Sequence, residues 1–174
     1  MNWINRRRWS APVSLGFLLV TAFLWQGCYT FNGNRIPEEI ESFTINFFTN
    51  QTNFVVPSLS QTFTEALKDK MAAETRLYLK DRGGDWEFSG AIVQYRNTPM
   101  APTGNETTAL NRLTIGVKVD FVNHKNEKEN WSQTFTRFED FEATQSLAEV
   151  EQELIRLITI QLVDDIYLKA ASDW

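Results

Sequence analysis

The sequence predicts an α+β fold: a two-layer sandwich in which two helices pack on one face of a four- to five-stranded, largely antiparallel sheet. Apolar residues at helical spacing near 58–74 and 146–171 indicate the two helices. Segments in which apolar and polar residues alternate, most clearly 112–122, indicate the strands. The predicted order is strand, helix, four strands and helix.

The first strand and the first helix are predicted within residues 41–74. In "ESFTINFFTN" (41–50), Phe43, Ile45 and Phe47 share one face and polar residues share the other, which is typical of a strand. After a loop, Ser58 and Gln61 match a capping box. A helix of about 17 residues is expected to follow, with a buried face made of Leu59, Phe63, Ala66, Leu67 and Met71.

Four more strands are predicted in the middle of the chain. "RLYLKD" (76–81) is a short strand, a glycine turn follows, and "WEFSGAIVQY" (86–95) is a longer strand in which Gly90 indicates a bulge or a close backbone approach. Residues 96–111 read as a loop that contains Pro99 and Pro102. "RLTIGVKVDFV" (112–122) places the odd-numbered residues from Leu113 to Phe121 on a buried face, and 131–141 return after a charged hairpin.

The last helix is predicted to begin at a second capping box, formed by Ser146 and Glu149, and to end near Ala171. At 1.5 Å per residue, these roughly 25 residues span about 37 Å, which is long enough to cross a sheet. The apolar stripe is formed by Val150, Leu154, Leu157, Ile158, Leu162, Val163 and Ile166.

The N-terminal residues predict an exported, lipid-anchored protein. Arg6, Arg7 and Arg8 precede a short apolar run that ends at Gly27, and Cys28, the only cysteine, follows directly. This arrangement resembles a bacterial lipobox, although Trp25 stands where such boxes usually carry Leu. It implies cleavage between Gly27 and Cys28 and diacylation of the thiol. The alternatives are a secreted protein with a free thiol and an uncleaved N-terminal anchor.

The domain organisation follows from this leader: a lipoprotein signal peptide at 1–27, a lipidated tether at 28–40 and one domain at 41–174. Without the leader, 14 Lys and Arg face 22 Asp and Glu. A nucleic-acid partner is not expected, because such a partner requires a basic face.

No arrangement of residues in the sequence predicts catalysis or metal binding. His124 is the only histidine and lies in the charged hairpin, where a solvated turn residue is expected. Asp164 and Asp165 point about 100° apart on a helix and are expected on a solvated face. We therefore expect no enzyme, no metal and no cofactor other than the lipid on Cys28.

The aromatic content after the leader is higher than a modest core obviously needs. Phe48 and Phe138 are predicted on the second strand face among Thr, Ser and Asn. Either they take part in ordinary packing, or they meet a partner or a lipid.

Several segments together resemble the lipopolysaccharide-assembly lipoprotein (LptE) family, and especially its branch in Bacteroidetes-type bacteria. The resemblance covers essentially the whole chain after the leader. It rests on "GCYTFNG", "IPEEIESFTINFFTN", "PSLSQTFTEALKDKM", "TRLYLKDRGGDWEFSGAI", "GNETTALNRLTIGVKVDF" and "SLAEVEQELIRLITIQLVDDIY".

The resemblance implies an α/β sandwich tethered by lipid to the inner leaflet of the outer membrane and facing the periplasm or the lumen of a barrel. It implies that the domain plugs the lipopolysaccharide-transport barrel (LptD-type), assists the folding of that barrel and aids delivery of lipopolysaccharide. The barrel is therefore the first expected partner and lipopolysaccharide the second. Only Cys28 matches a functional position of the family. Arg96, Arg112 and Lys118 are scattered candidates for lipopolysaccharide contact.

Two other function classes remain open at this point. A periplasm-facing lipoprotein that binds a soluble ligand or peptidoglycan would need a concave apolar pocket. A hydrolase would need a cluster of acid and base side chains, which the sequence does not supply.

Overall fold

The computed structural model describes residues 36–54, 56–101 and 109–172. The chain divides into two units, 1–33 and 34–174, and all described residues lie in the second. In chain order the elements are β1 (Ser42–Ile45), β2 (Thr49–Asn50), α2 (Pro57–Glu74), β3 (Tyr78–Leu79), β4 (Trp86–Met100), β5 (Leu110–Asn123), a 3-10 turn (Glu127–Glu129), β6 (Trp131–Glu142) and α3 (Leu147–Ser172).

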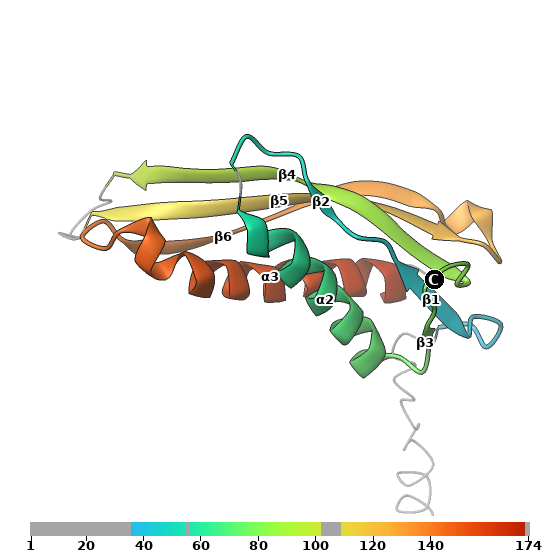
Figure 1. The fold of residues 1–174 in the computed structure, drawn as a ribbon. Helices are drawn as coiled ribbons and strands as arrows, with labels where there is room; N and C mark the ends of the chain where they lie inside the picture. Colours follow the sequence, from blue (N-terminus) through green and yellow to red (C-terminus); the bar gives the residue numbers. More distant parts are fainter. Residues whose placement is uncertain (1–35, 55, 102–108, 173–174) are drawn as a thin grey trace, which may run out of the picture. The chain divides into compact units, whose positions relative to one another are not determined.

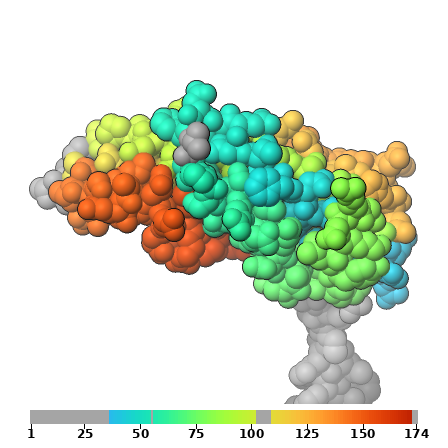
Figure 2. All heavy atoms as spheres, in the orientation of Figure 1, coloured from blue at the N-terminus to red at the C-terminus, as the bar shows by residue number. Residues whose placement is uncertain are grey.

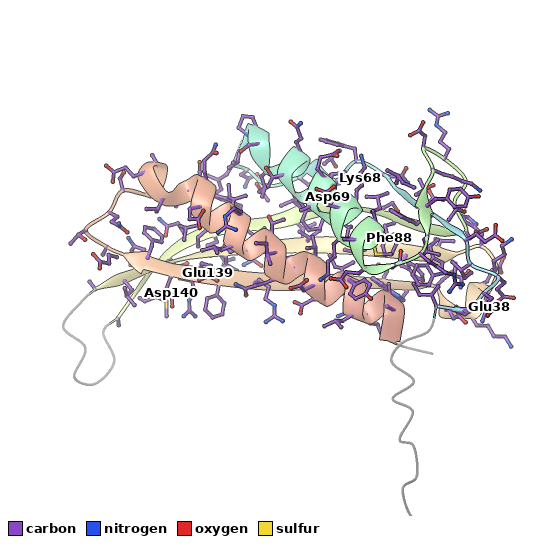
Figure 3. The ribbon with its side chains drawn as sticks, turned by 90° about the horizontal axis from the view of Figure 1, so that it is seen from below. Glu38, Lys68, Asp69, Phe88, Glu139 and Asp140 are labelled. Carbon is purple, nitrogen blue, oxygen red and sulfur yellow. The ribbon has the colours of Figure 1, made fainter. Side chains whose placement is uncertain are left out.

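The predicted α+β sandwich is confirmed: both helices lie on the same face of one sheet (Figures 1 and 3). The strand order is β3-β1-β4-β5-β6. The short strand β2 also pairs with β4, further along it than β1 does. The sheet has six strands rather than four or five, and it is mixed. Strands β4, β5 and β6 form an antiparallel meander, whereas β1 pairs in parallel with both β3 and β4.

The core lies between the helices and the inner face of the sheet. The alternation predicted for β5 is confirmed, because Leu113, Ile115, Val117, Val119 and Phe121 are all buried. The other main contributors are Phe43 and Phe48, Phe88 and Ile92 of β4, Leu59, Phe63, Leu67 and Met71 of α2, and Ile158, Leu162 and Ile166 of α3.

The prediction that Phe47 shares the buried face of the first strand is wrong. The chain leaves the β-ladder after Ile45, so strict alternation ends there. The backbone N–H of Phe48 donates to Thr64 Oγ1 at 3.1 Å, and its ring packs against Phe63 in the core. Phe47 is 59% exposed, and Phe48 is fully buried rather than on the polar face.

The two predicted capping boxes have different outcomes. Helix α2 begins at Pro57, whose fixed φ suits the first helical position, and its N-cap is Val56 without a side-chain hydrogen bond. The box predicted from Ser58 and Gln61 is therefore absent. At α3, the N–H of Ser146 donates to Glu149 Oε2 at 3.0 Å, which is one half of the predicted box.

Strand β4 continues five residues into the predicted loop. Pairs such as Arg96↔Thr114 and Thr98↔Arg112 extend its ladder with β5 to Met100. Pro99 is tolerated because this part of β4 has no partner strand on its other side among the described residues. The bulge lies between Ile92 and Gln94 rather than at Gly90.

Gly90 makes the close backbone approach that the sequence offered as the other explanation. Its φ is +155°, and a Cβ there would lie 2.0 Å from the carbonyl oxygen of Lys118. Only glycine fits at this point of the β4–β5 pairing.

Candidate functional site

The outer face of the meander is the face that neither helix covers. Side chains alternate across each strand, so the outer residues follow from the strand register. On the half of the sheet remote from β1 they are Gln94, Arg96 and Thr98 of β4, Arg112, Thr114 and Gly116 of β5, and Thr136, Phe138 and Asp140 of β6.

Arg112 is held on this face by two neighbours on β6. Its Nε and Nη2 donate to the two carboxylate oxygens of Asp140 at 2.7 and 2.8 Å. Its guanidinium carbon lies 3.7 Å from the centre of the Phe138 ring. The hydrogen bonds to Asp140 raise the pKa of Arg112, and the same bonds lower the pKa of Asp140. The result is a fixed cation stacked on an aromatic ring, with Nη1 not bound by Asp140.

The structure brings two of the three predicted cations together. Arg96 pairs with Thr114, two residues along β5 from Arg112, so the two arginines are diagonal neighbours on the same face, at about 7–8 Å. Arg96 is exposed and forms no ion pair with another described residue. Lys118 lies six residues further along β5, about 20 Å away, and its Nζ is 3.7 Å from Asp120.

A cleft of about 360 Å³ borders Arg96 at the free edge of β4. Its other walls come from the segment before α2, from β4 and from the first turns of α3, namely Phe54, Val56, Tyr95, Asn97, Leu147 and Glu151. The Tyr95 hydroxyl donates to Glu151 at 2.5 Å, and burial together with this bond raises the pKa of Tyr95. The sequence did not predict this cleft, because its walls come from segments that only the fold brings together.

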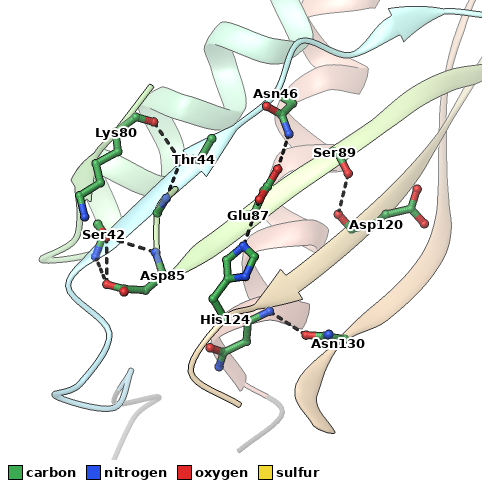
Figure 4. Close-up of polar contacts among 12 residues, drawn as sticks. Ser42, Thr44, Asn46, Lys80, Asp85, Glu87, Ser89, Asp120, His124 and Asn130 are labelled. Carbon is green, nitrogen blue, oxygen red and sulfur yellow. Dashed lines mark hydrogen bonds and ion pairs between the residues drawn. The ribbon is translucent and has the colours of Figure 1, made fainter. Parts of the chain in front are cut away.

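His124 takes part in a structural network at the other end of the sheet (Figure 4). Its Nε2 lies 3.0 Å from Glu87 Oε2, and Asn46 Nδ2 donates to Glu87 Oε1 at 2.8 Å. The hydrogen bond from His124 is the main cause that lowers the pKa of Glu87. This network ties the β5–β6 hairpin to β4 and to the end of β1.

Asp164 and Asp165, which were predicted on a solvated face of the last helix, are partly exposed and form ion pairs with neighbouring elements. Asp164 pairs with Lys70 of α2 at 2.7 Å, and Asp165 pairs with Arg137 of β6 at 2.5 Å. Because the two carboxylates point in different directions, Asp164 links α3 to α2 and Asp165 links α3 to β6.

Neither a metal cluster nor a membrane-spanning helix is found within the described ranges. These residues contain no group of three or more His, Cys, Asp and Glu side chains that could hold a metal ion. No helix among them is long and apolar enough to cross a bilayer. The predicted lipid site, Cys28, and the residue before it, Gly27, lie outside the described residues.

The sequence matches the family model for lipopolysaccharide-assembly proteins, LptE, over residues 40–170. The chain belongs to the LptE family. The match runs from just before β1 into the end of α3, so it includes every element of the sandwich. LptE is a family of non-enzymatic lipoproteins. The chain is therefore a membrane-associated lipoprotein of lipopolysaccharide assembly.

Solved structures show that other lipoproteins share the LptE fold of this chain. A minor lipoprotein from Acinetobacter baumannii superposes with a TM-score of 0.51 at 13% identity, covering 76% of this chain and 94% of that one. Rare lipoprotein B from Shewanella oneidensis gives 0.53 at 13% identity, covering 74% and 94%. At these identities the similarity shows the fold alone. No curated protein sequence matches the chain significantly.

Proposed function

We propose that this LptE-family chain is anchored to the outer membrane through a lipidated Cys28 and assembles, without catalysis, with the lipopolysaccharide-transport barrel (LptD-type). In this role the domain plugs the lumen of the barrel, assists its folding and aids delivery of lipopolysaccharide to the cell surface. The observation that carries the proposal is the family match across the whole sandwich, residues 40–170.

The cavities of the described residues favour this scaffold role over the binding of a soluble ligand or peptidoglycan. Pockets for small molecules usually measure about 300–1,000 Å³ and enclose their ligand. The cavities lined by described residues include grooves of about 250, 320 and 360 Å³, at or below the lower end of this range. They lie along the edge of the sheet rather than inside the domain.

We place direct contact with lipopolysaccharide at Arg96, Arg112 and Phe138. Two guanidinium groups on neighbouring strands suit phosphate, which accepts paired hydrogen bonds from arginine. Arg112 is already oriented by Asp140 and Phe138, so little side-chain entropy is lost on binding. Lys118 is too distant to join this pair.

The experiment that tests the main proposal is isolation of the tagged full-length protein from native membranes in mild detergent, followed by mass spectrometry. We expect an LptD-type barrel at close to one copy per copy of this chain. Recovery of the chain alone, or with cell-wall fragments, would overturn the proposal and favour a ligand-binding lipoprotein.

A further inference from the structure

The segment from Ser42 to Thr64 contains no charged residue, although 22% of all residues in the chain are charged. Part of this segment is exposed. Residues 51–54, which follow β2, project beyond the edge of the sheet (Figures 1 and 2). They contribute to a surface, here called the Phe54 surface, that consists of Phe47, Asn50, Thr52, Phe54, Pro57 and Val93.

The Phe54 surface gathers three large exposed apolar side chains. Phe47 and Phe54 are each 59% exposed, and Val93 is 40% exposed. A groove of about 250 Å³ separates Phe47 from Phe54, and another of about 320 Å³ lies between Phe54 and Val93. Apart from Arg96 at its border, no charged residue lines either groove. Single exposed apolar residues are ordinary, but a continuous group of this kind is typical of an interaction site.

Phe54 is held in place rather than left to move freely. Asn50 Oδ1 accepts hydrogen bonds from the N–H and the hydroxyl of Thr52, at 2.9 and 2.8 Å, and Asn50 Nδ2 donates to the carbonyl of Phe54 at 3.0 Å. The Phe54 ring also lies 5.8 Å from the ring of Tyr95. An aromatic side chain on a fixed backbone loses little entropy on binding and is suited to act as an anchor.

The absence of charge decides which kind of partner fits. Phosphate-bearing lipid would require cations, and only Arg96 borders the surface. A second copy of the chain is disfavoured, since both copies carry an excess of carboxylates. The centres of protein interfaces are depleted of charge and enriched in aromatic residues, as this surface is.

We propose that the Phe54 surface is the face through which this domain contacts an uncharged wall of its barrel partner, with Phe54 as the anchor. This inference rests on the proposed function and adds to it the contacting face. Phe47 and Phe54 lie outside the proposed lipopolysaccharide contact, and the two surfaces adjoin at Arg96, which lines the groove beside Val93.

The test repeats the membrane isolation with full-length Phe54→Ala and Phe47→Ala variants. Tyr78→Ala is the matched control, because Tyr78 is an aromatic residue of similar exposure, 52%, located on β3 outside the Phe54 surface. We expect each Phe variant to recover about one tenth or less of the barrel recovered by the wild type, as for an interface hot spot. The Tyr78 variant should match the wild type.

The outcomes distinguish the two proposals. If the wild type brings no barrel, the proposed function fails. If the wild type and both Phe variants bring equal amounts, the proposed function stands and the Phe54 surface is excluded as the contact. A photoreactive phenylalanine analogue at position 54 gives a second measurement that does not depend on weakening the complex. A cross-link to the barrel supports the inference, whereas one to lipid or to a second copy overturns it.

Discussion

Asp85 and Ser42 exchange hydrogen bonds across the start of the parallel pair β1–β4. The N–H and the hydroxyl of Ser42 donate to Asp85 Oδ2 at 3.0 and 2.9 Å, and the N–H of Asp85 donates to Ser42 Oγ at 3.1 Å. The Glu41 N–H donates to the same carboxylate oxygen at 3.0 Å, and Lys125 lies 3.3 Å from the other oxygen. One carboxylate therefore joins the start of β1, the start of β4 and the β5–β6 hairpin.

This arrangement predicts acid-sensitive stability. Burial alone would raise the pKa of Asp85, but donors from Glu41, Ser42 and Lys125 outweigh burial and lower it to about 2. A lowered pKa in the folded state stabilises the protein above the unfolded value, 3.8, and that contribution is lost as the pH falls towards 2. Asp85→Asn should lower the free energy of unfolding by about 2 kcal/mol at pH 7 and by much less near pH 2.

Urea unfolding of both proteins at pH 7 and at pH 2–3 measures this difference. Asp81→Asn, in the same β3–β4 connection, is the control and should change little at either pH. An Asp85→Asn effect of equal size at both pH values would mean that the lost hydrogen-bond geometry, rather than the charge, causes the destabilisation.

A second prediction concerns the close backbone approach at Gly90. Gly90→Ala should destabilise the domain by more than about 3 kcal/mol, because the added Cβ meets the Lys118 carbonyl and φ is unfavourable for any L residue. Gly83→Ala is the control: Gly83 has φ +68° but no atom within 4 Å of the added Cβ, so only about 1 kcal/mol should be lost. Chemical denaturation compares the two, and similar losses would show that the contact with Lys118 relaxes.

The lipid anchor gives a third prediction. Cys28→Ala should move the protein from the membrane fraction to the soluble fraction, while its free energy of unfolding changes by less than about 0.5 kcal/mol. The fold should persist because the core lies within the described residues, where Arg76 also binds the carbonyls of Ile36 and Pro37 at 3.1 and 2.7 Å. Fractionation and circular dichroism test both statements. A variant that fails to fold would contradict the separation of anchor and domain.

The fourth prediction concerns lipopolysaccharide. Arg112→Lys keeps the charge but loses the paired bonds to Asp140 and the stacking on Phe138, so it should weaken binding of purified lipopolysaccharide about three- to tenfold. Arg156→Lys is the control, because Arg156 donates the same pair of hydrogen bonds to a carboxylate, that of Glu153, but lies on α3. Equal binding by the wild type and both variants would exclude this face as the contact.

Local sequence pattern predicted the elements better than their edges or their site. The alternation from Leu113 to Phe121 and the long apolar stripe of α3 each have one period over many residues, so tertiary contacts did not override them. Phe48 is buried in place of Phe47, because the chain leaves the ladder and the N–H of Phe48 donates to Thr64, sixteen residues away.

The candidate site was predictable only in part. Pattern indicates which face a strand residue occupies, but the register between strands decides which residues meet. The sequence singles out Arg112 and Phe138 separately, but their contact depends on the β5–β6 register. The partnership of Asp140 with Arg112 depends on the same register. The Phe54 surface depends on how the segment before α2 crosses the edge of β4, which no local period encodes.

Two buried threonines give the last prediction, because the same substitution should destabilise the domain at one of them and not at the other. Thr64 is buried, accepts the N–H of Phe48 at 3.1 Å and donates to the Ser60 carbonyl at 2.7 Å. Thr64→Val keeps the shape but leaves a buried N–H without its acceptor, which should cost about 1–3 kcal/mol. Thr159 is equally buried, and its hydroxyl has no hydrogen-bond partner among the described residues.

Thr159→Val should therefore be neutral or should stabilise the domain by up to about 1 kcal/mol, because an unsatisfied hydroxyl is replaced by a methyl group in an apolar site. Urea unfolding of the two variants and the wild type gives the comparison under one set of conditions. A loss at position 159 as large as that at 64 would mean that the Thr159 hydroxyl has a partner in solution, such as a buried water. A neutral Thr64→Val would mean that the Phe48 N–H finds another acceptor, and the link from the β1–β2 connection to α2 would then not depend on Thr64.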